Sequence, residues 1–176
     1  MADPVDGLFQ DWRGLGGAVL VAGRDPDPPV RPPEVVIAES TAQCRASSRL
    51  TWVVLDWLLR HVEKVDVQTL LQRTRERGDL SVLGVLADAA NQRRPHPTFE
   101  RIVRTCAPNP TLEVFFHRVA QSPLAARLAR EHALDLFRRW NYLSSELCYL
   151  GDEPGYTADH GPSSTATLVL DGSSST

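Results

Sequence analysis

The two side chains whose types and spacing best suit chemistry are Arg127 and His132. They stand five residues apart in a segment with helical periodicity, so both could reach one groove. An imidazole moves the proton of a ribose 2′-hydroxyl, while a guanidinium holds the neighbouring phosphate. Side chains of these types at this spacing can together act on a phosphodiester without a metal ion.

The six residues from Arg127 to His132 have the Arg-x4-His spacing of the all-helical HEPN ribonucleases, and this short segment resembles theirs. The resemblance implies a ribonuclease in which Arg127 and His132 converge on RNA, often across a dimer. Position 128 is Leu where that family commonly has a polar residue, and the apolar periodicity of 123–140 places both Leu128 and His132 on a face predicted to be buried. The pattern favours a solvated arginine beside a core histidine. Catalysis by the pair is the alternative.

Other residues that bind metals or activate nucleophiles do not form a recognisable set. Glu113 and His117 are spaced i, i+4 on a helix predicted over residues 112–120, but no third ligand of suitable spacing accompanies them. Three cysteines stand far apart without CxxC spacing, which argues against a disulfide framework and a zinc site. No Ser-His-Asp, P-loop or HExxH pattern occurs. We therefore expect no metal and no cofactor, and we expect a binding protein in preference to an enzyme.

The arginines suggest a nucleic-acid-binding alternative. Residues 47–150 hold 15 Lys and Arg against 11 Asp and Glu, a balance of +4, which is weak for a dedicated nucleic-acid binder. The helices predicted over 67–77 and 80–92 are joined by a Gly-containing turn, yet the second presents mainly apolar residues where a recognition helix needs polar ones. A helical DNA-binding regulator is thus the weaker alternative. Its candidate contacts are Arg73, Arg75, Arg77, Arg93 and Arg94.

The C-terminal half of the body combines arginine with aromatic residues, a composition typical of protein interfaces. Trp12 is a further candidate anchor, because a tryptophan in a Gly/Pro-rich segment has to pack on something. We expect a protein partner or a homo-oligomer. The candidate partner-binding residues are Trp12, Phe116, Arg118, Arg138, Arg139 and Trp140.

These side chains are expected to be positioned by helices. The chain has 176 residues and 42% hydrophobic content, enough for one domain with a core. The helices at 50–62 and 80–90 are apolar on nearly every side and are predicted to form the centre. Asp56 and Arg60 are spaced i, i+4 and are predicted to pair on the exposed stripe of the first helix. The predicted class is mainly α, a compact bundle of five to seven short helices. Ser47 or Ser48, Asp66 and Asp79 are predicted to cap the three central helices. Together with the breakers, the capping residues predict helices over 49–64, 67–77, 80–92, 99–106, 112–120, 123–140 and 142–149.

Segments of different composition flank the helical body at 47–150. Residues 1–46 form a Gly/Pro-rich arm with two strand-like runs, Ala18–Val21 and Val35–Ile37. Residues 151–176 consist mainly of Ser, Thr, Gly and acidic residues, so a flexible, disordered tail is expected there.

The remaining features bear on compartment and function. No stretch of about 18 uncharged apolar residues occurs, and the N-terminus does not resemble a secretory signal, so we expect a cytoplasmic protein without membrane association. Lys64 is the only lysine, which indicates the coding bias of a GC-rich bacterium. The leading hypothesis is a non-enzymatic bacterial interaction or regulatory protein that works by protein–protein binding, similar in character to an antitoxin or an adaptor.

Overall fold

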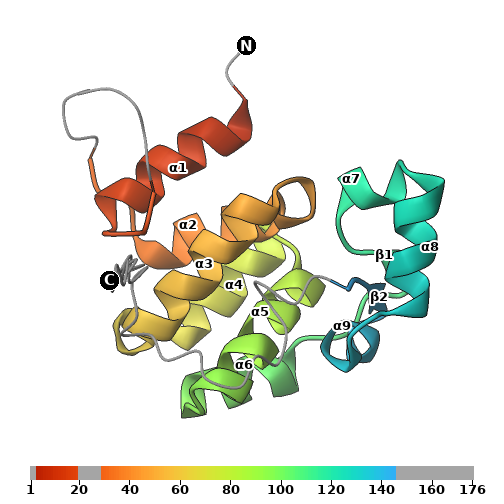
Figure 1. Cartoon of the computed structure of the whole chain (residues 1–176). Helices are drawn as coiled ribbons and strands as arrows, with labels where there is room; N and C mark the ends of the chain where they lie inside the picture. Colours follow the sequence, from red (N-terminus) through yellow and green to blue (C-terminus); the bar gives the residue numbers. More distant parts are fainter. Residues whose placement is uncertain (1–2, 20–28, 146–176) are drawn as a thin grey trace, which may run out of the picture.

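The computed structural model describes residues 3–19 and 29–145 (Figure 1). In these residues it is mainly α, as the sequence predicts, with nine α-helices, two short 3-10 helices and two two-residue strands. Nine exceeds the predicted five to seven, because two helices, at Pro4–Gly14 and Pro33–Thr41, form in the N-terminal arm. The α-helices are α1 (Pro4–Gly14), α2 (Pro33–Thr41), α3 (Ser48–His61), α4 (Val67–Arg77), α5 (Leu80–Arg93), α6 (Pro97–Thr105), α7 (His117–Ala120), α8 (Pro123–Glu131) and α9 (Asp135–Arg139). The remaining elements are η1 (Cys44–Ala46), η2 (Val62–Lys64), β1 (Glu113–Val114) and β2 (Tyr142–Leu143).

The caps predicted for the central helices are confirmed. Ser47 accepts a hydrogen bond from the backbone N–H of Leu50 at the start of α3, and Asp66 accepts one from Thr69 at the start of α4. At α5, the Asp79 carboxylate accepts from the first-turn backbone N–H groups. Each cap satisfies donors that an α-helix leaves without partners, so these helices begin within one residue of the predicted positions.

Helices α3 and α5 lie at the centre of the core, as predicted from their apolar sequences. Residues 53–59 of α3 and 81–87 of α5 are all buried. The predicted ion pair of Asp56 with Arg60 is present at 3.2 Å. Asp56 was expected on an exposed stripe, but its side chain is only 3% exposed, because neighbouring elements cover α3 on that side too.

The described part of the N-terminal arm is mainly helical and contains no strand, which corrects the expectation of strand-like runs. Val35–Ile37 belongs to α2, where Pro33 supplies a helical φ at the first turn and Val36 and Ile37 are fully buried. Helix α2 crosses α4 closely, since a Cβ at Gly78 would lie 2.3 Å from the carbonyl oxygen of Ala38. The run Ala18–Val21 lies partly outside the described residues, and its described part forms no strand.

Trp12 fastens the arm to the body. Its side chain is fully buried, its Nε1 donates to Ser40 Oγ at 2.9 Å, and its ring lies 5.6 Å from that of Trp57. The Trp57 Nε1 in turn donates to the carbonyl of Leu15. Residues 3–19 and 33–41 therefore pack on the helical body as part of one core.

The C-terminal part departs most from the predicted helices. Residues 112–120 give β1 and the one-turn α7, and the helix predicted over 123–140 is divided into α8 and α9. In place of a helix at 142–149, β2 pairs in parallel with β1, and residues 146–149 lie outside the described range. Asn141 has φ of +57°, a left-handed conformation that asparagine tolerates, and it turns the chain from α9 into β2.

We call residues 112–145 the C-terminal lobe; Figure 1 shows its elements grouped at one side of the helical body. Trp140 packs against the bare backbone of α5 at Gly84, and its Nε1 donates to Asp88 Oδ2 at 2.9 Å. Arg139 donates to the same carboxylate oxygen. Closer to the start of α5, the hydroxyls of Ser81 and Tyr142 share a hydrogen bond of 2.6 Å. The lobe is thus attached along the length of α5.

Replacing Gly84 by Ala is expected to destabilise the protein. A Cβ at this position would lie 2.2 Å from the Trp140 ring, and overpacking of this kind costs about 1–3 kcal/mol. That cost exceeds the gain of about 0.5–1 kcal/mol from replacing glycine in a helix. Urea unfolding measures the change.

The matched control is Gly7→Ala in α1, where an added Cβ meets nothing within 4 Å. This variant should be as stable as the unmodified protein or slightly more stable. Equal stability of Gly84→Ala and Gly7→Ala would contradict the packing described for Trp140.

Candidate functional site

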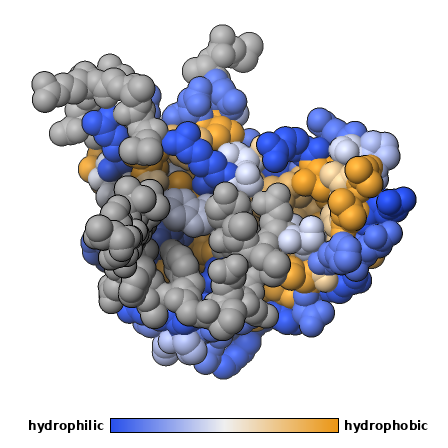
Figure 2. All heavy atoms as spheres, viewed as in Figure 1, coloured by the Kyte–Doolittle hydropathy of each residue, from blue (hydrophilic) through white to orange (hydrophobic). Residues whose placement is uncertain are grey.

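Large apolar side chains are exposed mainly on the C-terminal lobe. Among the described residues, Leu112, Leu124 and Leu128 are 60%, 59% and 41% exposed, and Val30 is the one large hydrophobic residue with comparable exposure elsewhere. Helix α8 turns Ala126 and Ala129 inward, so its two leucines face solvent. Figure 2 shows hydrophobic residues gathered over this lobe, at the right of the view.

Two adjoining hollows lie beside α7, and both are lined by Phe116 and Val119. The apolar hollow has a volume of about 140 Å³. The basic hollow has a volume of about 200 Å³. We call the two hollows together the groove. The apolar hollow is also lined by Val114, Ala125, Leu128, Ala129, Leu143, Ser144 and Ser145, and the basic hollow by Arg45, Ala46, Ser47, Ser48, Arg49 and Arg118.

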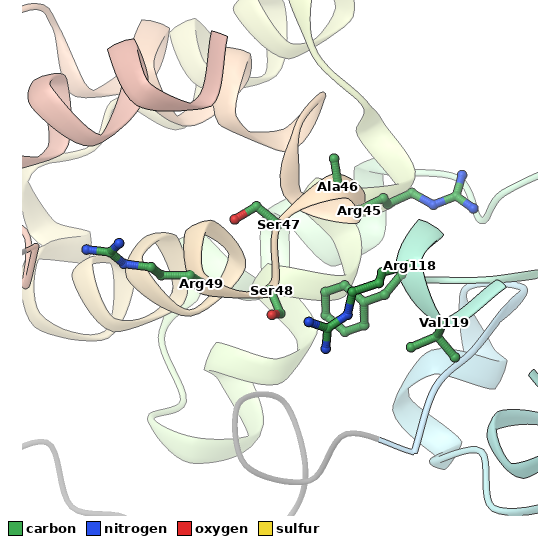
Figure 3. Close-up of a pocket in the computed structure, with 8 residues that line it drawn as sticks. Arg45, Ala46, Ser47, Ser48, Arg49, Arg118 and Val119 are labelled. Atoms are coloured by element: carbon green, nitrogen blue, oxygen red, sulfur yellow. The ribbon is translucent and has the colours of Figure 1, made fainter. Parts of the chain in front are cut away.

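The three arginines of the basic hollow have different surroundings. Figure 3 shows the guanidinium groups of Arg45 and Arg49 directed to opposite sides, while that of Arg118 lies near Ser48. The Arg49 guanidinium stacks over the Phe9 ring at 4.7 Å. Arg118 is exposed and forms no ion pair within the described part of the chain. It is therefore the arginine best placed to meet a negatively charged group in the groove.

Arg45 holds one side of the groove in place. Its guanidinium donates to the backbone carbonyls of Val114 and Phe115, at 2.9 Å each, and lies over the Tyr142 ring. It also pairs with Glu113 at 3.0 Å. A hydrogen bond from Thr111 and the nearby Arg45 guanidinium lower the pKa of Glu113 from its ordinary value. Arg45 thus joins η1 to β1 and serves the architecture of the groove.

The residues considered for catalysis are all exposed. Arg127 is exposed and pairs with Glu131 at 3.6 Å. His132, predicted to lie on a buried face, is exposed, because α8 ends at Glu131 and His132 is its C-terminal cap. Glu113 and His117 do not share a helix, since Glu113 belongs to β1 and His117 begins α7.

The described thiols are poor nucleophiles. Cys44 is fully buried, and burial raises the pKa of its thiol to about 12. Burial likewise raises the pKa of the Cys106 thiol to about 12. A thiol of this kind carries almost no thiolate at neutral pH. Cys148 lies outside the described residues.

Within residues 3–19 and 29–145, no group of three or more His, Cys, Asp or Glu side chains is placed to hold a metal ion. None of the helices in that part of the chain combines the length and the apolar character needed to cross a membrane.

Three of the residues proposed to bind a partner are interior. Trp12, Phe116 and Trp140 are 0%, 4% and 4% exposed, so their rings serve the core, with Phe116 at the edge of the groove. Arg138 and Arg139 are on the surface, where Arg138 donates to backbone carbonyls of the lobe and Arg139 contacts Asp88. Among the six residues proposed to bind a partner, Arg118 is the one that is both exposed and part of the groove lining.

Sequence reasoning assigned Leu128 to the buried face of a long helix and did not single out Leu112 or Leu124. In the structure all three are exposed. The exposure could not be predicted from the apolar periodicity of 123–140, because that prediction treated the segment as a single continuous helix. The division after Glu131 gives α8 and α9 separate inward faces.

The arginines proposed for nucleic acid mostly have acidic partners. Arg73 pairs with Glu76 at 3.1 Å and Arg77 with Glu39 at 3.1 Å. Arg94 pairs with Glu63 at 3.5 Å and also donates to the carbonyl of Leu59. Arg93 is half-buried, and Arg75 is exposed. Phosphate would have to compete with these carboxylates, and DNA binding by this set stays a prediction.

Comparisons with family models, with curated protein sequences and with solved structures find no match for this chain.

The variant His132→Ala separates the ribonuclease hypothesis from a purely structural histidine. Because His132 is exposed at a helix end, its removal is expected to change the free energy of unfolding by less than about 0.5 kcal/mol. RNA cleavage by the purified protein, measured with a fluorescent oligonucleotide, is expected to be absent before and after the change. Cleavage that disappears with His132 while the fold remains intact would instead identify a catalytic pair.

Proposed function

We propose that this protein is a non-enzymatic regulatory protein that binds another protein through the groove of its C-terminal lobe. The observation that carries the proposal is the exposure of Leu128, which lines a mainly apolar hollow on the C-terminal lobe. Exposed apolar surface of this kind marks interaction sites on proteins. An antitoxin-like or adaptor-like protein of the bacterial cytoplasm fits this mode of action.

The chemistry of the groove defines the partner we propose. The apolar hollow, at about 140 Å³, is close in size to a cavity of about 150 Å³ that accepts a benzene molecule, so one leucine-sized side chain fits it. The adjoining Arg118 suits a carboxylate. Residues 112–145 hold five arginines against three acidic residues, so the lobe attracts negative charge. The partner is therefore an acidic segment with an apolar anchor residue.

The support for a preformed site comes from the contacts beneath it. Arg45 ties β1 to η1, and the Phe115 N–H donates to the carbonyl of Leu143 to join the two strands. Trp140 and Asp88 attach the lobe to α5. A surface held in this way loses little conformational entropy on binding.

The direct test compares Leu128→Asp with Leu124→Asp in the full chain. Both changes place one carboxylate on exposed positions of α8, but only Leu128 lines the apolar hollow. We expect the unmodified protein and Leu124→Asp to co-purify one protein in stoichiometric amounts from the native host. Leu128→Asp should weaken this binding at least about tenfold, because it removes a central apolar contact and repels the acidic partner. Titration of the purified partner measures the change.

Chemical cross-linking then locates the contact. The partner segment linked near Arg118 should carry an apolar residue flanked by acidic ones. If both leucine variants bind the partner equally well, or if no stoichiometric partner is captured, the proposed function is wrong. Capture of a second copy of this chain through the groove would make the protein a homo-oligomer and would replace the acidic partner.

A further inference from the structure

The C-terminal residues of this chain have the composition that the groove selects. Residues 146–176 lie outside the described structure, and their sequence holds five acidic residues and no Lys or Arg. They contain one apolar run toward their end, Leu168-Val169-Leu170, followed directly by Asp171. An apolar anchor beside a carboxylate is the pattern that the apolar hollow and Arg118 together accept.

The C-terminal segment begins next to the groove. Ser144 and Ser145, the last described residues, line the apolar hollow. Twenty-two residues, 146–167, separate Ser145 from Leu168. For 22 residues the random-coil relation gives a root-mean-square span of roughly 25 Å, so the length of chain is sufficient for Leu168 to reach the hollow beside Ser145.

Covalent attachment makes weak docking sufficient. A segment tethered by a short flexible linker is present at its site at an effective concentration on the order of millimolar. The hollow holds about one apolar side chain, and a separate peptide would bind it weakly. For a tethered segment weak binding is enough, because no second molecule has to be recruited.

We infer that Leu168–Leu170 docks into the apolar hollow of its own chain, with Asp171 facing Arg118. The inference rests on the proposed function, since it assigns regulation to the same groove: a partner must displace the C-terminal segment before it binds. The tail is thus an internal competitor whose acidic and apolar residues imitate the partner.

Hydrogen exchange of the full chain, followed by mass spectrometry, tests the inference. We expect slowed exchange at residues 166–171 in the unmodified protein. The variant Leu168→Asp/Leu170→Asp should abolish this protection and raise exchange in α8 and around Val119. The matched control, Ser173→Asp/Ser175→Asp, adds the same charge outside the apolar run and should leave both regions unchanged.

The groove variants provide the reciprocal evidence. Leu128→Asp should release residues 166–171, whereas Leu124→Asp should not. Unslowed exchange at 166–171 in the unmodified protein would overturn the inference, as would equal effects of the two tail variants. Protection that falls on dilution would also overturn it, because the tail would then occupy a second copy.

The outcomes separate this inference from the proposed function. If the tail is not protected but Leu128→Asp still abolishes partner binding, the groove binds a partner and the tail inference alone is wrong. If the tail is protected but no partner depends on Leu128, the proposed function is wrong and the tail occupies the groove for another reason. If both hold, Leu168→Asp/Leu170→Asp should bind the purified partner more tightly than the unmodified chain.

Discussion

Helix α5 has to present bare backbone at Gly84, because the Trp140 ring lies directly against it. Four residues further along α5, Asp88 accepts hydrogen bonds from Trp140 and Arg139. These contacts fix where the chain returns after α9, and β2 begins two residues beyond Trp140. The position of the chain after α9 in turn determines how β2 pairs with β1. It therefore also determines where α7 and the two hollows beside it lie.

The central helices were predictable because their signals are local. A capping Ser47, Asp66 or Asp79 acts within three residues, and a nearly continuous apolar sequence marks α3 and α5 as interior. The arm was not predictable in this way. Glycine and proline around short apolar runs suggested extended segments, yet Pro33 starts a helix, and the burial of Val36 and Ile37 stabilises it.

The C-terminal lobe was misjudged because its structure depends on contacts that are distant in the sequence. Glu113 pairs with Tyr142 across 29 residues, and no pattern within 112–120 or 142–149 announces the pairing. Tertiary contacts override weak helix propensity in both segments. The exposure of Leu128 and His132 follows from the same departure, since each was placed by a helix that does not continue. Most of the candidate site could therefore not be predicted from the sequence. Among the exposed residues of the groove, Arg118 had been named from the sequence.

The C-terminal lobe is a fixed part of the fold, so its groove is a preformed surface. Native-state hydrogen exchange of individual backbone amides in the full chain shows whether the lobe opens together with the helical body. The amides of Phe115 and Leu134, which donate to Leu143 and Ser144, report on closure of the lobe, and that of Leu86 reports on α5. We predict that the opening free energies of Phe115 and Leu134 agree with that of Leu86 within about 1 kcal/mol, because the lobe and α5 open as one cooperative unit. Opening of Phe115 and Leu134 at a free energy several kcal/mol below that of Leu86 would show that the lobe opens independently and would contradict the account.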